Sequence, residues 1–387
     1  MREQKKWALP FMVISIFIIS LNLRPAISSI GPLLDTIRDD LILTNSQVSL
    51  LTSIPVFCMG LFASLAVPFN RSFGLKKSVY VLITLIGLFT ALRWFNPNFW
   101  TLAISAFFIG TAIAIIGPLL SATIKKNFPQ RATQLISVYS FGMGLGAALA
   151  SGLTGVFYAV FDWPFALAAW SLLAVLALVV WKFTKFPEQD LQVKNTTGRK
   201  IASPWKDFKA WLMLIFFGLQ SSLFFSFITW LAPMAIEKGF SLLEAGTILT
   251  VMTTVQLVVN LSLPGLLAKW KNRTGWILFG IVSSLTGVLL LMVPGTATIY
   301  PAAVLVGISL GMLFPLALLM PIDAAESAEE VNSWTSMIQS GGYLFSALIP
   351  LAIGMVYDVT GNHFYTNFIF IVILSFMILI TLLLKNR

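Results

Sequence analysis

The stretch Leu-Asn-Leu-Arg-Pro at residues 21–25 decides how this chain is interpreted, because it places a charge inside a long apolar run. The run covers about residues 7–34, and Arg24 lies well inside it. A helix rises about 1.5 Å per residue and a bilayer core is about 30 Å thick, so we expect Arg24 near the middle of a membrane span. A guanidinium there is costly unless it faces water, a partner or a ligand.

The composition of the chain is that of an integral membrane protein. Of its 387 residues, 58% are hydrophobic and only 10% are charged, whereas soluble domains have about 25% charged residues. The single cysteine and the single histidine exclude a disulfide framework and argue against a Cys- or His-based metal site. No phosphate-binding loop, metalloprotease motif or serine elbow is present. We therefore expect neither an enzyme nor a bound cofactor or metal.

Twelve apolar runs are long enough to cross a bilayer. The longest polar segment separates the first six runs from the last six and resembles a linker. We predict an all-α membrane protein with an N-terminal six-helix bundle (1–184), a cytoplasmic linker (185–208) and a C-terminal six-helix bundle (209–387). The runs cover about residues 7–34, 46–69, 77–95, 99–122, 133–160, 164–183, 209–235, 243–267, 274–293, 299–321, 334–357 and 364–384.

The distribution of Lys and Arg predicts the orientation of the chain in the membrane. With both termini in the cytoplasm, all but four of the 25 basic residues fall in cytoplasmic segments, as the positive-inside rule requires. The net charge of +10 is then a topology signal and does not indicate nucleic-acid binding. The acidic connection that contains Asp323 is either a solvated face or the partner of a basic cytoplasmic loop. The four remaining basic residues are Arg24, Arg38, Arg93 and Lys238.

The two halves of the chain repeat the same pattern of small and kinking residues. Gly110 and Pro118 are eight residues apart, and so are Gly307 and Pro315, which lie 197 positions later. Parallel six-helix repeats are typical of transporters whose substrate site lies between the repeats near the membrane midplane. We expect a monomer in a lipid bilayer whose partner is a small-molecule substrate.

Polar residues deep in the spans are the candidates for that site. No Asp or Glu lies deep in any span, so Arg24 lacks an expected carboxylate partner and is predicted to bind an anionic or electron-rich ligand through its planar donors. The alternative is that Arg24 bonds backbone carbonyls or neighbouring Gln and Tyr side chains and only holds helices together. Asn22 lies nearly opposite Arg24 on a regular helix, so both face one ligand only if Pro25 distorts the turn. The candidate substrate-binding residues are Arg24, Ser28, Gln220, Gln339, Tyr343, Tyr139, Asn22, Trp230 and Asn260. For the uncharged members, interhelical hydrogen bonding is the competing interpretation.

The connection after the second run carries Arg71, Gly74, Lys76 and Lys77, a candidate gating loop on the cytoplasmic side. With twelve spans in two repeats, these residues resemble the major facilitator superfamily, although Asn70 stands where that family's loop signature normally has an acid. Within the superfamily, the chain resembles the cyanate permease and nitroimidazole transporter family. The motifs that carry this resemblance are at residues 21–25, 117–120, 124–129, 218–221, 230–233, 339–343 and 358–361.

The resemblance implies the major facilitator fold and a plasma-membrane transporter. We expect a secondary active or facilitative transporter that moves a small anion, such as a cyanate-like ion, or a nitroheterocycle by alternating access, with Arg24 as the anchor. The alternative is a proton-coupled exporter of hydrophobic drugs, for which an intramembrane carboxylate would be expected.

Overall fold

The structure is a computed structural model that describes residues 2–128, 131–184, 203–324 and 328–385. Within these ranges all regular elements are helices. The first group, here called the N-terminal half, consists of α1 (Arg2–Leu21), α2 (Pro25–Ser28), η1 (Gly31–Leu33), α3 (Leu34–Asp40), α4 (Asn45–Phe62), η2 (Ala63–Leu65), α5 (Ala66–Phe95), α6 (Phe99–Asn127), α7 (Ala132–Val160), α8 (Trp163–Ala168) and α9 (Ser171–Phe183).

The second group, here called the C-terminal half, begins after residues that lie outside the described ranges. The predicted linker 185–208 falls mostly there, so the predicted domain boundaries stay a prediction. The half consists of η4 (Pro204–Lys206), α10 (Phe208–Glu237), α11 (Leu242–Lys269), α12 (Arg273–Met292), α13 (Ile299–Ala324), α14 (Ala328–Ser346), α15 (Leu348–Thr360) and α16 (Phe364–Lys385).

The helix of the first span is interrupted between Leu21 and Pro25. Helix α1 ends at Leu21, and the amides of Asn22 and Leu23 donate to the carbonyls three residues earlier, at 3.0 and 3.1 Å. Pro25 has no amide hydrogen and begins the short helix α2. The distortion considered for Pro25 is therefore present, within one candidate membrane span that covers Phe11–Asp40.

Eleven helical segments of the described chain are long and apolar enough to span a membrane. One of them, Asn45–Phe95, has 51 residues and covers the two runs predicted at 46–69 and 77–95. Gly74 lies inside it with φ 71°, a left-handed conformation that glycine adopts without strain. The chain reverses there, so the eleven segments agree with twelve crossings.

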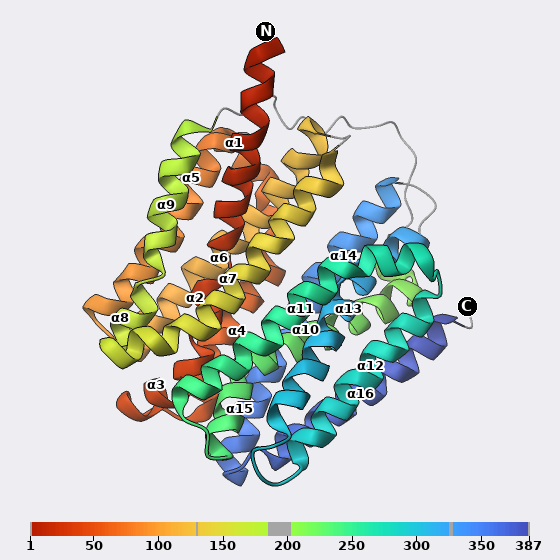
Figure 1. Cartoon of the computed structure of the whole chain (residues 1–387). Coiled ribbons are helices and arrows are strands. Elements are labelled where there is room, and N and C mark those ends of the chain that lie inside the picture. The colour runs from red at the N-terminus through yellow and green to blue at the C-terminus, as the bar shows by residue number, and fades with distance from the viewer. Residues whose placement is uncertain (1, 129–130, 185–202, 325–327, 386–387) are drawn as a thin grey trace.

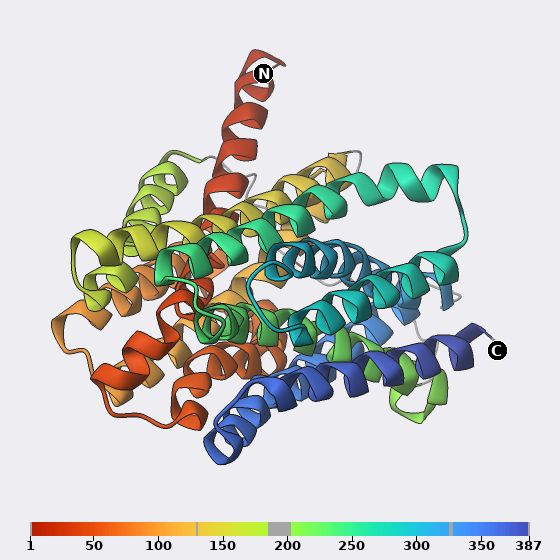
Figure 2. The same ribbon diagram turned by 60° about the horizontal axis from the view of Figure 1, so that its bottom comes forward.

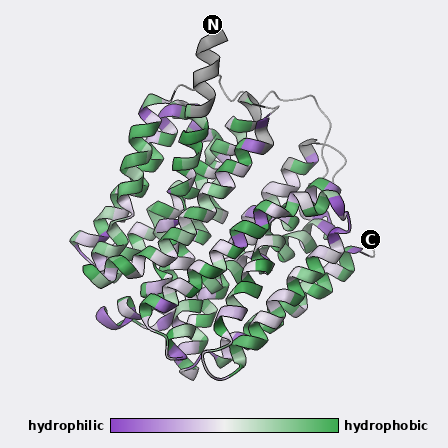
Figure 3. Ribbon diagram, viewed as in Figure 1, coloured by the Kyte–Doolittle hydropathy of each residue, from purple (hydrophilic) through white to green (hydrophobic). Residues whose placement is uncertain are grey.

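The two halves lie side by side and lean against each other (Figures 1 and 2). Across the interface, α7 packs on α11, and α4 packs on α14 and α15. Apolar residues cover most of the helix surfaces, and hydrophilic residues gather toward the helix ends (Figure 3). This distribution suits a molecule whose outer surface faces lipid.

Glycines allow the close helix contacts that hold this arrangement. A Cβ at Gly60 of α4 would lie 2.7 Å from the carbonyl oxygen of Ser340 in α14, so the halves approach closely there. A Cβ at Gly146 of α7 would collide with the carbonyl of Leu21, the last residue of α1. Small residues at such contacts are typical of membrane helix packing.

Candidate functional site

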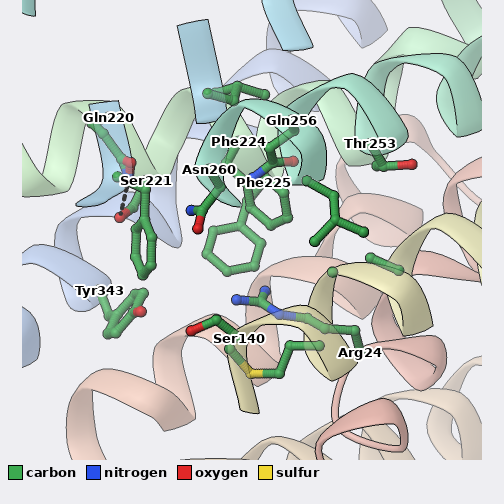
Figure 4. A pocket seen from close by; sticks show the side chains of 16 residues that line it. Arg24, Ser140, Gln220, Ser221, Phe224, Phe225, Thr253, Gln256, Asn260 and Tyr343 are labelled. Atoms are coloured by element: carbon green, nitrogen blue, oxygen red, sulfur yellow. Dashed lines mark hydrogen bonds between the residues drawn. The ribbon is translucent and has the colours of Figure 1, made fainter. Parts of the chain in front are cut away.

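A cavity of about 740 Å³, including the part open to solvent, lies between the two halves. It is bounded by α7, α10, α11, α13 and α14 and by the break after α1 (Figure 4). Its lining residues are Arg24, Ser140, Met143, Gly144, Ala147, Gln220, Ser221, Phe224, Phe225, Thr253, Gln256, Leu257, Asn260, Leu310, Phe314 and Tyr343.

Arg24 is the one charged residue of this lining. Its guanidinium carbon lies 5.1 Å from the ring centre of Phe224 and 5.6 Å from that of Phe225, and Figure 4 shows the side chain reaching toward both rings. Within the described ranges its guanidinium has no hydrogen-bond acceptor and no carboxylate partner. The faces of the two rings stabilise the cation, but its donors remain available.

Helix α10 contributes two polar residues to the cavity lining, followed one turn later by two aromatic residues. Gln220 and Phe224 are four residues apart, as are Ser221 and Phe225, so both pairs share one helix face. The Nε2 of Gln220 donates to the Oγ of Ser221 at 3.2 Å. The Oε1 of Gln220 is buried and has no partner among the described residues. Because an unsatisfied buried acceptor is costly, this atom is a candidate ligand contact.

Helices α11 and α14 complete the polar lining. Thr253, Gln256 and Asn260 follow one another at helical spacing on α11. The ring of Tyr343, on α14, packs edge-on against Phe217, with 5.2 Å between ring centroids. None of the lining residues is Asp or Glu. The cavity therefore combines one cation with neutral amides, hydroxyls and aromatic rings.

Four of the predicted site residues line the cavity together: Arg24, Gln220, Asn260 and Tyr343. They come from both halves of the molecule and from distant parts of the chain. The structure thus brings the predicted anchor and three of its predicted neutral partners to one space. Their roles in binding stay predictions.

The other five predicted residues lie outside this lining. Asn22 is buried in the turn after α1, where its Nδ2 has no partner among the described residues, and Ser28 is buried at the end of α2. The hydroxyl of Tyr139 lies against Gly117 of α6. Gln339 is partly exposed one turn before Tyr343 on α14. Trp230 is buried, and its Nε1 donates to the carbonyl of Pro350 at 3.0 Å.

The aromatic pair Phe224 and Phe225 was missed by the sequence analysis. In a chain with 32 phenylalanines, two more in an apolar run carry no signal of their own. Their spacing of four residues from Gln220 and Ser221 was the available signal. Thr253 and Ser140 were missed for a similar reason, because small hydroxyl side chains are common in membrane helices.

The predicted gating loop forms hydrogen bonds with the end of α9, in its own half. The side chains of Arg71, Lys76 and Lys77 are exposed. The Nζ of Lys76 donates to the carbonyl of Lys182 at 3.4 Å, and Trp181 donates to the carbonyl of Lys76 at 3.0 Å. These bonds join the start of the third crossing to the end of α9. A gating role for the loop stays a prediction.

The two halves are bonded directly at the end of the molecule opposite the termini, here called the closed end. The carboxylate of Asp358, in α15, accepts four hydrogen bonds from Asn45 and Ser46, the first two residues of α4. The Oγ1 of Thr229 in α10 donates to the Oγ1 of Thr52 in α4 at 2.9 Å. These bonds hold α4 against α10 and α15.

Asp323, in the last turn of α13, forms an ion pair. Asp323 pairs with Arg273, the first residue of α12, in the loop region that follows α11. Of the two interpretations of the acidic connection, the partnership with a basic loop is confirmed for Asp323. The pair lies within the C-terminal half and does not join it to the N-terminal half.

Comparisons with known proteins identify relatives over almost the whole chain. The family model for the Major Facilitator Superfamily matches residues 12–347. The chain is 30% identical to the 2-nitroimidazole transporter of Escherichia coli (strain K12), covering 91% of the chain and 89% of that protein. It is also 30% identical to the cyanate transport protein CynX of the same organism, covering 91% of each. The crystal structure of the nucleoside transporter NupG (D323A mutant) superposes with a TM-score of 0.76 at 11% identity, covering 97% of this chain and 99% of that one.

Proposed function

The chain belongs to the Major Facilitator Superfamily and is a membrane transporter, and from that premise we propose that Arg24 anchors its substrate. The proposed substrate is a small anionic or electron-rich polar solute, and the proposed mechanism is alternating access. Binding occurs in the central cavity, and the two halves then rock about it to expose it to the other side of the membrane.

The observation that carries this proposal is the unpaired guanidinium of Arg24. Its contacts are two phenylalanine rings, and among the described residues it has neither a carboxylate nor a hydrogen-bond acceptor. The side chain is half-buried, and a charge partly removed from water without a partner is costly. A planar anion or a nitro group would supply the missing acceptors, because a guanidinium forms two parallel hydrogen bonds with such groups.

The neutral part of the lining supports a small polar solute. Gln220, Gln256 and Asn260 provide amide donors and acceptors without adding charge. Phe224 and Phe225 provide flat apolar faces for a planar ligand. The names of two relatives specify cyanate, a small anion, and 2-nitroimidazole, a planar nitroheterocycle. An anion and a planar nitroheterocycle can each bind beside one cation and two aromatic faces.

The orientation follows from the charges. We place both termini in the cytoplasm of a bacterial cell, because the basic residues gather in the segments on that side. The closed end is then the outer end, and the described conformation faces inward. The bonds of Asp358 to Asn45 and Ser46 would have to break when the carrier turns outward.

A proton-coupled exporter of hydrophobic drugs is less well supported. Such a carrier would be expected to hold a titratable carboxylate in its cavity, and none of the lining residues is Asp or Glu.

The experiment that tests the proposal is a thermal-shift titration of the purified protein with cyanate, nitrate and 2-nitroimidazole. A ligand raises the apparent stability in proportion to the logarithm of its concentration over its dissociation constant. We expect Arg24→Ala to weaken binding at least about tenfold, because each hydrogen bond to a charged group contributes about 1.5–3 kcal/mol. Arg24→Lys should restore binding only partly, because it lacks the planar pair of donors.

The matched control is Arg131→Ala, which removes an exposed guanidinium outside the cavity. It should bind as the wild type does. Equal stabilisation of the wild type and Arg24→Ala by any of these probes, or equal uptake of that probe by proteoliposomes, would refute the anchor role.

A further inference from the structure

A second arginine, Arg93, lies more deeply buried than Arg24 but outside the cavity. It sits in the last turn of α5, and only 1% of its surface is exposed. The sequence analysis noted it only as a basic residue outside the cytoplasmic segments. A fully buried guanidinium needs a structural or functional reason, because desolvation of a charge costs several kcal/mol.

The contacts of Arg93 point to the broken first span. Its Nε donates to the Oγ of Ser105 in α6 at 2.9 Å, and its Nη1 donates to the backbone carbonyl of Ala26 in α2 at 2.9 Å. The hydroxyl of Ser105 donates onward to the carbonyl of Leu102 at 2.7 Å, so its lone pairs are free to accept. Among the described residues, no carboxylate pairs with Arg93.

The carbonyl of Ala26 lacks its usual helical donor. In a regular helix the amide of Ile30 would donate to it, but that amide donates instead to Ile27, at 3.3 Å. Within a membrane, an unsatisfied backbone group costs several kcal/mol, so irregular backbone persists only where other groups satisfy it. The guanidinium of Arg93 takes the place of the missing amide.

We propose that Arg93 is a positioning residue that fixes the break at residues 22–28 and thereby directs Arg24 into the cavity. Ala26 is two residues from Arg24, and the ring of Pro25 between them restricts the backbone. Through Arg93 the break is tied to both α5 and α6, so it moves with the N-terminal half as one body. The inference rests on the proposed function of Arg24, but its geometric part can be tested without a ligand.

The test measures how accessible position 24 is from the cavity. In a Cys58→Ala background, Arg24→Cys is labelled with a charged methanethiosulfonate reagent, with and without Arg93→Gln. We expect Arg93→Gln to lower the labelling rate at position 24 at least about tenfold, because the glutamine is too short to reach both Ser105 and Ala26. Hydrogen exchange of a peptide that spans residues 22–28 should rise in the same variant.

The matched control is Asn260→Cys, which lines the cavity from α11 in the other half. Its labelling rate should stay within twofold when Arg93 is replaced. Unchanged labelling at position 24 and unchanged exchange at 22–28 would overturn the proposal, and so would equal losses at positions 24 and 260, which indicate a general disruption. If Arg93→Gln does not fold, Arg93→Lys allows the same comparison, because lysine has a single nitrogen in place of the separate Nε and Nη1 that reach Ser105 and Ala26.

The two hypotheses fail separately. If Arg24→Ala still binds cyanate, nitrate or 2-nitroimidazole as the wild type does, the anchor role is wrong, whatever happens at Arg93. If Arg24 binds but its accessibility does not depend on Arg93, only the positioning role is wrong.

Discussion

The central cavity and the closed end differ in whether their charged side chain has hydrogen-bond partners. In the cavity, the guanidinium of Arg24 has aromatic faces but no acceptor among the described residues. At the closed end, the carboxylate of Asp358 accepts hydrogen bonds from the backbone and side chains of Asn45 and Ser46. An unmatched charge is suited to a ligand that comes and goes. A matched charge is suited to a contact that holds one conformation of the protein.

The largest expected effect comes from breaking the matched charge. Asp358→Ala leaves the donors at the start of α4 without their acceptor, and each hydrogen bond to a charged group contributes about 1.5–3 kcal/mol. We expect the closed end to open more often, so that Thr229→Cys, buried in the wild type, is labelled by a membrane-impermeant thiol reagent at least about tenfold faster. The labelling is measured in intact cells in the Cys58→Ala background.

The control for this variant is Asp39→Ala, which removes an exposed carboxylate that pairs with Arg38 at the same end. It should leave labelling at position 229 unchanged, since exposed ion pairs contribute little. Equal labelling in Asp358→Ala and its parent would show that these bonds do not hold the closed end shut.

A smaller effect is expected from altering the uncharged side of the cavity. Gln220→Leu removes the acceptor that has no partner and the donor beside it, so we expect the probe that stabilises the wild type to bind about fivefold more weakly, as the loss of about 1 kcal/mol predicts. Gln220→Glu should weaken anion binding more, because it adds a negative charge to a lining that has none. The thermal-shift titration measures both.

Equal anion affinities of Gln220→Leu and Gln220→Glu would change the interpretation of the cavity. If Gln220→Glu bound anions as tightly as Gln220→Leu does, a negative charge at position 220 would have no effect on anion affinity, and the bound anion would not lie near this side chain. The hydroxyl control is Ser222→Ala, a buried neighbour on α10 that lies outside the lining and donates to the carbonyl of Gly218.

A separate effect, on the stability of the fold and not on binding or labelling, concerns His363, near the closed end. Burial, together with the positive charge of Arg38, lowers its pKa to about 3, although the carboxylate of Glu237, a charge that favours the protonated form, lies 4.0 Å from its Nε2. Because the folded-state pKa lies below the ordinary value, the neutral imidazole stabilises the fold fully at neutral pH, and this contribution falls as the pH drops below about 6.5. Wild-type protein should therefore lose up to about 2 kcal/mol between pH 7 and pH 5 through this residue.

The comparison that isolates His363 is the melting temperature of wild type and His363→Gln at both pH values. The variant should lose less stability on acidification, since carboxylates elsewhere titrate in both proteins. Parallel losses would mean that the imidazole stays protonatable in the fold and that Glu237 outweighs burial.

The crossings and the arginine inside the first span were predictable from local sequence. Long apolar runs identify spans because every backbone polar group in lipid must be satisfied internally. Arg24 was identifiable because a charge inside such a run is costly. The neutral candidates were less predictable: Gln220, Asn260 and Tyr343 line the cavity, whereas Gln339, Ser28 and Trp230 lie outside its lining. A membrane helix uses the same polar residues for packing and for binding, so residue type alone does not separate the two uses.

The sequence by itself determined that this protein is a polytopic membrane protein with one unexplained cation in its first span, because hydropathy and charge are properties of the residues themselves. Tertiary structure decided where that cation points and what surrounds it. The break after Leu21, the rings of Phe224 and Phe225 and the bond from Arg93 to Ala26 come from segments far apart in the chain. Which helix faces meet depends on packing between the halves, and that packing is not encoded in any one span.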